Sequence, residues 1–125
     1  MKYLGGKQRI GKEISVILKK YAENNNVNGY LEPFCGALGV LKHMTNDYKC
    51  YASDIHEELI LLWNGVKYNT FKPPLKIDET DWIKIKNTKK KTALKAFVGF
   101  GCSYGGIYFD SFFDKHSNNN HNSCK

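Results

Sequence analysis

The fold class is inferred from the segment Glu32-Pro33-Phe34-Cys35-Gly36-Ala37-Leu38-Gly39. Together with the residues from Val27 onward, its first part predicts a short buried strand over 27–34. Residues 35–39 predict a tight turn, which leads into a helix that continues to Met44. Glycine lets a turn approach a ligand closely, and nucleotides bind where a strand of a parallel sheet opens onto a helix N-terminus. The stretch therefore predicts a nucleotide-binding corner.

A second strand and helix follow this corner. Residues 48–54 predict a strand and residues 57–68 a helix, whose wide apolar face comprises Leu59, Ile60, Leu62, Trp63 and Val66. Alternation of strands and helices favours an α/β fold with a parallel sheet and flanking helices. Asp54 ends the second strand, where a carboxylate can accept hydrogen bonds from the ribose of an adenosine-containing cofactor. An aspartate there can equally cap the following helix, and a strand, glycine turn and helix is common, so each signal alone leaves a structural role open.

The residues before the corner predict one more helix. Apolar residues spaced by three and four indicate an amphipathic helix that ends near 24–26 and packs one face: Ile10, Ile14, Ile17, Leu18 and Tyr21. Directly before it, Tyr3-Leu4-Gly5-Gly6-Lys7 offers two flexible backbone units and a cation. Such a segment can hold the carboxylate of an amino-acid cofactor.

The second half of the chain is less regular. Lys72-Pro73-Pro74 breaks the pattern, an unassigned polar stretch follows, and residues 93–98 predict a helix. No conformation is assigned to the glycine-rich and aromatic residues 99–114. We expect one domain over 1–114 and a disordered polar tail over 115–125.

Composition limits the partners and the chemistry. A net charge of +7 with Arg9 as the single arginine favours attraction to phosphates over reading of base edges. No apolar run approaches the ~20 residues of a membrane span and no signal region opens the chain, which predicts a soluble, cytoplasmic protein without a membrane partner. The four cysteines lack metal or disulfide spacing, and no metal site is expected: Cys35, Cys50, Cys102 and Cys124.

Single residues that could suggest other chemistry have simpler interpretations. Cys35 lies in the turn and not in a Pro-Cys motif, so we interpret it as a small turn residue and not as a nucleophile. His116, His121 and Cys124 could gather a metal, but their polar surroundings favour disorder. His43 and His56 are expected on helix surfaces, and the lysine run at 89–91 is expected to be a solvated face.

Three motifs in this order resemble the Dam-like (D12 class) DNA adenine-N6 methyltransferase family. They are Tyr3-Leu4-Gly5-Gly6-Lys7, then Leu31-Glu32-Pro33-Phe34-Cys35-Gly36, then Ala52-Ser53-Asp54-Ile55 with Leu59-Ile60 and Trp63-Asn64. The resemblance implies S-adenosylmethionine as cofactor, with Asp54 on the ribose. The cofactor-binding residues that it implies are Tyr3, Gly5, Gly6, Lys7, Glu32, Phe34, Gly36 and Asp54.

Two departures from the family pattern shape the expected function. The family turn usually has a second glycine where this chain has Leu38, with Gly39 displaced by one. The Asp- or Asn-Pro-Pro-aromatic motif that holds a flipped adenine is absent, because Pro73-Pro74 lies between Lys72 and Leu75. The resemblance therefore implies a Rossmann-like methyltransferase fold truncated before its fourth strand, with no catalytic residue of its own and an open edge on the first strand that lowers stability.

These observations lead to three hypotheses. The first is the cofactor-binding part of a site-specific DNA adenine methyltransferase, inactive alone and completed by a second polypeptide, with weak lysine-mediated binding to double-stranded DNA. The second is a catalytically dead module that binds cofactor or DNA. The third is a dinucleotide-binding domain, because the same turn and aspartate serve both cofactors.

Overall fold

The computed structural model describes residues 1–113, which divide into two compact units. We call Gly5–Ile55 the sheet unit, and Met1–Leu4 together with the chain from His56 onward the helical unit. The expected tail over 115–125, with its two histidines and one cysteine, lies outside the described residues. The single domain expected over 1–114 stays a prediction, since two compact units can belong to one domain.

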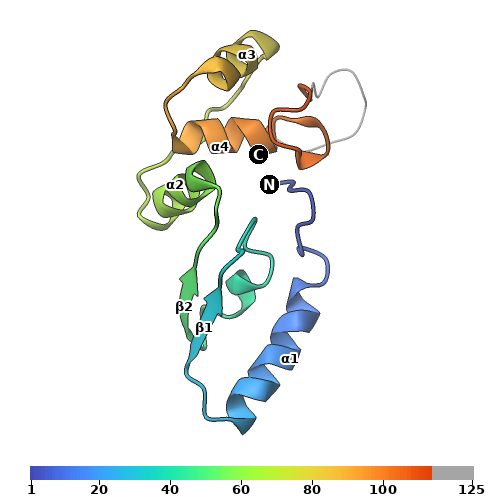
Figure 1. Cartoon of the computed structure of the whole chain (residues 1–125), viewed down its shortest axis with the longest axis vertical. Coiled ribbons are helices and arrows are strands. Elements are labelled where there is room, and N and C mark those ends of the chain that lie inside the picture. The colour runs from blue at the N-terminus through green and yellow to red at the C-terminus, as the bar shows by residue number, and fades with distance from the viewer. Residues whose placement is uncertain (114–125) are drawn as a thin grey trace. The chain divides into compact units, whose positions relative to one another are not determined.

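The sheet unit contains two parallel strands, as the alternating pattern predicted. Strands β1 (Gly29–Glu32) and β2 (Lys49–Ala52) pair in register from Gly29 opposite Lys49 to Glu32 opposite Ala52 (Figure 1). Beyond the strands, the N–H of Ser53 donates to the Glu32 carbonyl at 3.0 Å. Because the pairing is parallel, the segments that follow β1 and β2 leave the sheet at the same edge.

Strand β1 is shorter and more exposed than the buried strand predicted over 27–34. Its residues alternate between exposed and half-buried, and Leu31 is 62% exposed. On β2, Tyr51 is 53% exposed. Among the described residues each strand has one partner. The apolar side chains of Leu31 and Tyr51 remain in contact with solvent.

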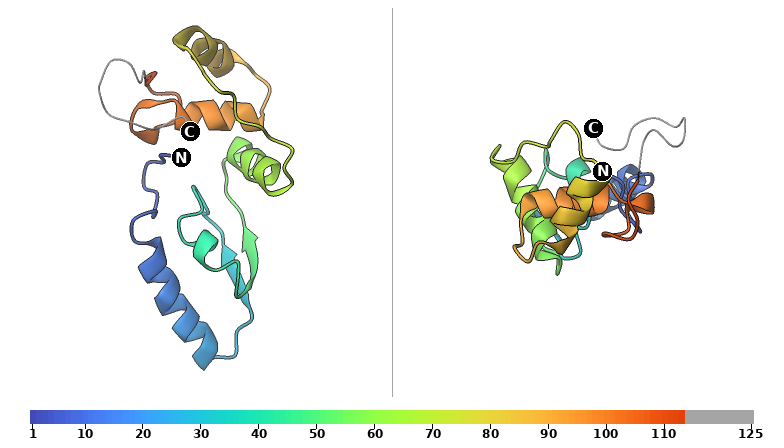
Figure 2. Two further views of the ribbon diagram at one scale, coloured as in Figure 1. Left: turned by 180° about the vertical axis from the view of Figure 1, so that it is seen from behind. Right: turned by 90° about the horizontal axis from the view of Figure 1, so that it is seen from above.

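The helix expected to continue to Met44 is a single 3-10 turn, η1 (Leu41–His43). Leu38 adopts the left-handed region at φ 57°, which interrupts a right-handed helical path before it starts. Hydrogen bonds between residues three apart follow, as in a 3-10 helix; the Met44 N–H donates to the Leu41 carbonyl at 2.8 Å. Val40 and Met44 are nonetheless buried, and η1 lies between β1 and α1 (Figures 1 and 2).

Helix α1 (Gly11–Asn24) ends where the sequence predicted but does not bury all of the predicted face. Its buried residues are the small ones, Gly11, Ser15 and Ala22, whereas Ile17 and Tyr21 are 70% and 64% exposed. The cause is a close approach: a Cβ on Gly11 would overlap the Gly39 carbonyl oxygen. Small residues permit this contact. Of the five large apolar residues expected on the packed face, Ile14 and Leu18 are half-buried, and the expectation is wrong for Ile10, Ile17 and Tyr21.

The helical unit is built from three helices and a second 3-10 turn. Helices α2 (Glu57–Lys67) and α3 (Glu79–Asn87) both pack against α4 (Ala93–Gly101), which lies between them (Figures 1 and 2). The two core clusters are Leu59, Leu62, Ala96 and Phe100, and Trp82, Val98, Cys102 and Phe109. Val66 is 56% exposed, so the buried face of α2 is narrower than the sequence pattern predicted. No helix in the described residues has both the length and the apolar character that crossing a bilayer requires.

Helix α3 lies in the stretch that the sequence pattern left unassigned. Its start is fixed by Asp78, whose side chain accepts a hydrogen bond from the Asp81 N–H at 2.8 Å. Trp82 and Ile85, three residues apart, then turn toward the cluster around Val98. An N-cap followed by this spacing was the signal that could have predicted the helix.

Residues 99–113 form the end of α4, the turn η2 (Tyr104–Gly106) and an isolated antiparallel bridge from Ser103 to Phe112. This segment also holds the chain's first residues, because the Leu4 N–H donates to the Gly106 carbonyl at 3.3 Å. A Cβ on Gly106 would lie 2.6 Å from the Lys2 carbonyl carbon. A glycine is therefore required where the two segments cross.

Candidate functional site

The turn after β1 is bonded directly to the end of β2. The Cys35 N–H donates to the Ser53 carbonyl at 3.0 Å, and the Ser53 hydroxyl donates to the Pro33 carbonyl at 3.1 Å. Gly36 adopts the left-handed region at φ 45°, which glycine tolerates at little cost. The two segments that the sequence placed at one edge of the sheet are thus in contact.

Asp54 anchors this turn. Its Oδ2 accepts a hydrogen bond from the Gly36 N–H at 2.9 Å, and the residue is half-buried. The N-cap position of α2 is His56, two residues further along the chain. The carboxylate therefore lies beside the glycine turn at the edge of the sheet.

Glu32 connects the end of β1 to η1. Its Oε2 accepts a hydrogen bond from the Leu41 N–H at 2.9 Å. Burial raises the pKa of Glu32, while the bonds from Leu41 and Tyr30 and the charge of Lys7 act in the opposite direction. Burial and the adjacent Glu32 carboxylate raise the pKa of Tyr30 to about 12. Glu32 therefore has a structural task in addition to any contact with a ligand.

The N-terminal segment of the sheet unit packs against the other side of the turn. A Cβ on Gly39 would lie 2.8 Å from the Lys7 carbonyl carbon, so the displaced glycine permits this approach. The Gln8 side-chain amide donates to the Ala37 carbonyl at 2.7 Å. Lys7, the last residue of the Tyr3-Leu4-Gly5-Gly6-Lys7 motif, thus contacts the turn through its backbone and belongs to the same unit as Asp54.

Seven of the eight predicted cofactor-binding residues belong to the sheet unit: Gly5, Gly6, Lys7, Glu32, Phe34, Gly36 and Asp54. Phe34 is 85% exposed and Lys7 is also exposed, so an aromatic ring and a cation are available on the surface of this unit. The eighth, Tyr3, belongs to the helical unit, where its ring lies 4.9 Å from that of Phe100.

Cys35 has the properties of a structural residue. It is 3% exposed, and burial, followed by the charges of Asp54 and Glu32, raises its pKa to about 11. A thiol with this pKa is protonated at neutral pH, and a nucleophile requires the thiolate. Both properties are consistent with the interpretation of Cys35 as a small turn residue.

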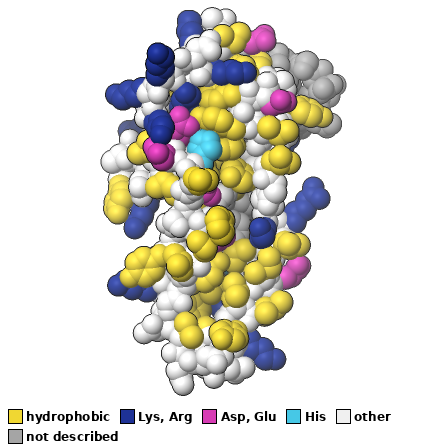
Figure 3. Space-filling model, viewed as in Figure 1, with side chains coloured by type: hydrophobic (Ala, Val, Ile, Leu, Met, Phe, Trp, Pro, Cys, Tyr) yellow, Lys and Arg dark blue, Asp and Glu magenta, His cyan; other side chains and the backbone are white. Residues whose placement is uncertain are grey.

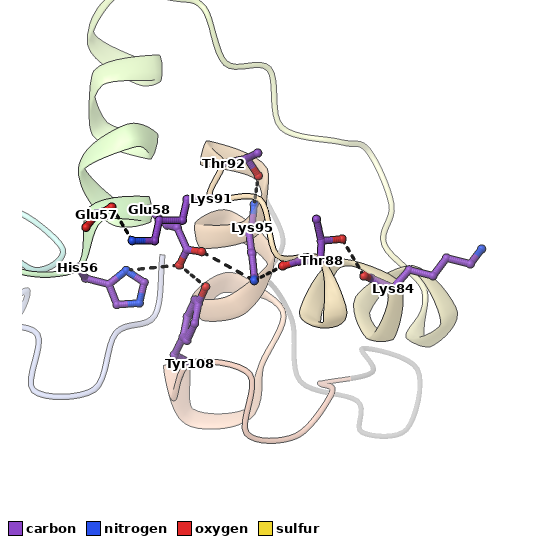
Figure 4. A network of polar contacts seen from close by, with 9 residues as sticks. All are labelled: His56, Glu57, Glu58, Lys84, Thr88, Lys91, Thr92, Lys95 and Tyr108. Atoms are coloured by element: carbon purple, nitrogen blue, oxygen red, sulfur yellow. Dashed lines mark hydrogen bonds and ion pairs between the residues drawn. The ribbon is translucent and has the colours of Figure 1, made fainter.

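The helical unit contains a polar network that the sequence patterns did not predict (Figure 4). Glu58 is 8% exposed, and its Oε2 accepts a hydrogen bond of 2.5 Å from the Tyr108 hydroxyl. Its other oxygen lies 3.8 Å from Lys95 Nζ, and His56 Nδ1 lies 3.8 Å from Oε2. Burial, followed by the bond to Glu58, raises the pKa of Tyr108. One feature of the sequence could have predicted this network. Glu58 lies four residues before Leu62 on α2, and residues four apart share one face of a helix, so the carboxylate is on the buried face.

His56 does not have the helix-surface role expected for it. Its ring makes edge contacts with Phe100 and Tyr108, with centroids 5.0 and 4.5 Å apart. The helical unit also has a shallow cavity of about 550 Å³, and none of the predicted cofactor-binding residues lines it. The lining residues are Leu61, Asn64, Gly65, Tyr68, Thr70, Phe71, Lys91, Thr92 and Ala93.

Comparison with known proteins identifies the family. The model of the D12 class N6 adenine-specific DNA methyltransferases matches residues 3–97. The Type II methyltransferase M.MjaIII of Methanocaldococcus jannaschii is 37% identical over 70 residues, which cover 54% of this chain and 24% of that relative. No solved structure matches the chain significantly.

The chain belongs to the D12 class of N6 adenine-specific DNA methyltransferases. Its mixed α/β structure, with a two-stranded parallel sheet and four α-helices in the described residues, is consistent with part of a methyltransferase fold. The aligned region spans about a quarter of the length of the relative.

Proposed function

We propose that this chain is the S-adenosylmethionine-binding part of a DNA adenine-N6 methyltransferase with a Rossmann-like fold. The observation that carries the proposal is the hydrogen bond from Gly36 to Asp54, which joins the glycine turn to the strand-ending carboxylate. The backbone of Lys7 packs against the same turn at Gly39. Lys7, Gly36 and Asp54, which come from three motifs that are separate in the sequence, therefore all belong to the sheet unit.

The residues present fit such a cofactor. Asp54 supplies a half-buried carboxylate, the group that accepts hydrogen bonds from ribose hydroxyls. Gly36 has no side chain between the turn and a ligand, and the Lys7 cation suits a carboxylate. When bound, the cofactor supplies a methyl group on a sulfonium centre. The task of these residues is to bind and orient it, which is how positioning contributes to transfer reactions.

We also propose that the chain alone does not methylate DNA. The sequence has no Asp- or Asn-Pro-Pro-aromatic motif to hold the amino group of an extruded adenine. A second polypeptide that supplies this motif would also cover apolar residues that the sheet unit leaves exposed, such as Tyr21, Leu31 and Tyr51. Addition of such a polypeptide should produce N6-methyladenine, whereas a catalytically dead binding module would give no product under any condition.

Calorimetry with S-adenosylhomocysteine tests the cofactor assignment. Asp54→Asn keeps an oxygen that can accept from the Gly36 N–H but removes the charge, and we expect it to weaken binding by roughly tenfold or more, as for loss of a hydrogen bond to a charged group. The matched control is Asp47→Asn, because Asp47 lies on the surface of the same unit in an ion pair with Lys19.

Unchanged affinity in Asp54→Asn would remove the proposed ribose contact. Preferential binding of NAD over S-adenosylhomocysteine would favour the dinucleotide-binding alternative instead.

A further inference from the structure

The last turn of α3 and the connection from α3 to α4 carry a concentration of positive charge. The segment 84–91 contains five lysines and no acidic residue: Lys84, Lys86, Lys89, Lys90 and Lys91. Lys and Arg side chains gather over the region where Figure 1 draws α3 and α4 (Figure 3). The acidic residues of α3 lie in its first turn, at the other end of the helix.

Two neighbouring lysines have structural partners. Lys91 Nζ donates to Glu57 Oε2 at 2.6 Å, and this bond raises the pKa of Lys91. Lys95 is half-buried, lies 3.8 Å from Glu58 Oε1 and donates to the Thr88 carbonyl. Lys91 thus contacts α2, and Lys95 links α4 to α2 and to the start of the connection.

The connection is fixed at both of its ends. The Thr88 hydroxyl donates to the Lys84 carbonyl at 3.0 Å, and the Thr92 hydroxyl accepts from the Lys95 N–H at 3.1 Å as the N-cap of α4 (Figure 4). Lys89 and Lys90 lie between these two anchors and are exposed. An anchored turn presents its side chains with less entropy to lose on binding than a free loop would.

The remaining lysines have no carboxylate partner among the described residues. Lys84 is exposed, and its side chain extends away from the polar network in Figure 4. Lys86 is exposed and lies over the Trp82 ring, 4.8 Å from its centroid. Stabilisation of a helix C-terminus by cations explains lysines in the last turn of α3, but Lys89 and Lys90 come after that helix has ended.

We infer that Lys84, Lys89 and Lys90, which we call the linker lysines, contact the phosphates of double-stranded DNA. Lysine is a point charge that attracts phosphate without reading base edges, so the contact is independent of DNA sequence. Surface lysines without internal partners keep their full charge available for a polyanion. The inference rests on the proposed function, because it assigns to the linker lysines part of the contact with the methyltransferase's substrate.

The test is the salt dependence of binding to a mixed-sequence DNA duplex, measured by fluorescence anisotropy with the whole chain. Each neutralised phosphate contributes about 0.9 to the slope of log affinity against log salt. We expect Lys84→Gln with Lys89→Gln and Lys90→Gln to lower the slope by about 0.9 for each phosphate that is no longer neutralised. Glutamine keeps good helix propensity at position 84.

The matched control changes three exposed lysines elsewhere to glutamine: Lys12, Lys20 and Lys67. It has the same net charge as the first variant, so an equal fall in slope in both would overturn the inference in favour of a diffuse charge effect. An unchanged slope in the first variant, or no measurable DNA binding by the unmodified chain, would also overturn it. The pair Lys89→Gln with Lys90→Gln, outside both helices, repeats the test without touching a helix.

Cofactor binding separates this inference from the proposed function. The linker-lysine variant should bind S-adenosylhomocysteine as the unmodified chain does, because all three lysines lie outside the sheet unit. A reduced salt slope with cofactor binding intact supports the inference. A chain that shows the slope change but binds no S-adenosylhomocysteine would contradict the proposed cofactor and leave the phosphate contact standing.

Discussion

The Gly36 N–H donates to Asp54 Oδ2 across 2.9 Å, and this bond joins the turn after β1 to the residue that follows β2. Gly36 is buried, and the Asp54 carboxylate supplies an acceptor for its N–H. The side chain proposed to bind ribose thus also maintains the shape of the turn. A substitution at position 54 can therefore act on folding and on binding, and the two effects can be separated by the choice of side chain.

We expect Asp54→Ala to lower the free energy of unfolding by about 1.5–3 kcal/mol, as for loss of a hydrogen bond to a charged group. Asp54→Asn retains an acceptor and should cost less than half as much. Urea unfolding of both variants measures the difference. Equal losses would mean that the Gly36 bond contributes nothing to stability.

Leu38 should be a point of backbone strain. Its φ of 57° lies in the left-handed region, where a residue with a Cβ is less stable than glycine by about 1–2 kcal/mol. Leu38→Gly should relieve this strain at the position where the family turn usually has glycine, and raise the urea midpoint. Gly36→Ala, at φ 45°, is the reciprocal control and should lower it. A lower midpoint in Leu38→Gly would mean that burial of the leucine side chain outweighs the strain.

Tyr108 and Glu58 should be energetically coupled. Their bond of 2.5 Å joins a buried carboxylate to the segment after α4. In a double-mutant cycle of Tyr108→Phe and Glu58→Gln we expect a coupling of about 1.5–3 kcal/mol, typical of a hydrogen bond to a charged group. Additive effects of the two substitutions on unfolding would show that the bond is not a stabilising one.

Tyr30 should make stability fall at alkaline pH. Its pKa is raised from 10.0 to about 12, so the folded chain holds the phenolic proton more tightly than the unfolded chain does. The contribution is complete below pH 10.0 and is lost as the pH rises through about 12. Tyr30→Phe should show a shallower decline of unfolding free energy across this window, and identical declines would refute the shift.

The exposed face of α1 should tolerate a charge in the isolated chain. Ile17 is 70% exposed, so Ile17→Lys should change the free energy of unfolding by no more than about 0.5 kcal/mol. Met44→Ala, in the same unit at a residue only 2% exposed, should cost about 2–5 kcal/mol. A loss of similar size in Ile17→Lys would show that this face is packed in solution.

The predicted low stability has a related structural basis. The sequence predicted an open edge on the first strand, and the described sheet has two strands with exposed side chains at Leu31 and Tyr51. We expect urea unfolding with a low midpoint for a chain of this size. A midpoint typical of a robust domain would contradict the prediction.

Most secondary structure followed from local patterns. Apolar spacing predicted α1, α2 and the start of α4, because a period of 3.6 residues is a local property. Helix α3 was missed although Asp78 and Trp82 carried its signal, since a short polar stretch offered only a weak period. The turn and Asp54 were named as partners of one ligand, but the direct bond between Gly36 and Asp54 depends on pairing of strands far apart in sequence.

The family motifs, the parallel order of the strands and the glycine at the turn follow from the sequence, because they depend on residue type and local spacing. The burial of small residues on α1, the left-handed conformation of Leu38 and the burial of Glu58 beside Tyr108 become visible with the folded chain. The physical reason is close packing: which side chain is covered depends on how near two backbones come, and that distance is set by the whole unit.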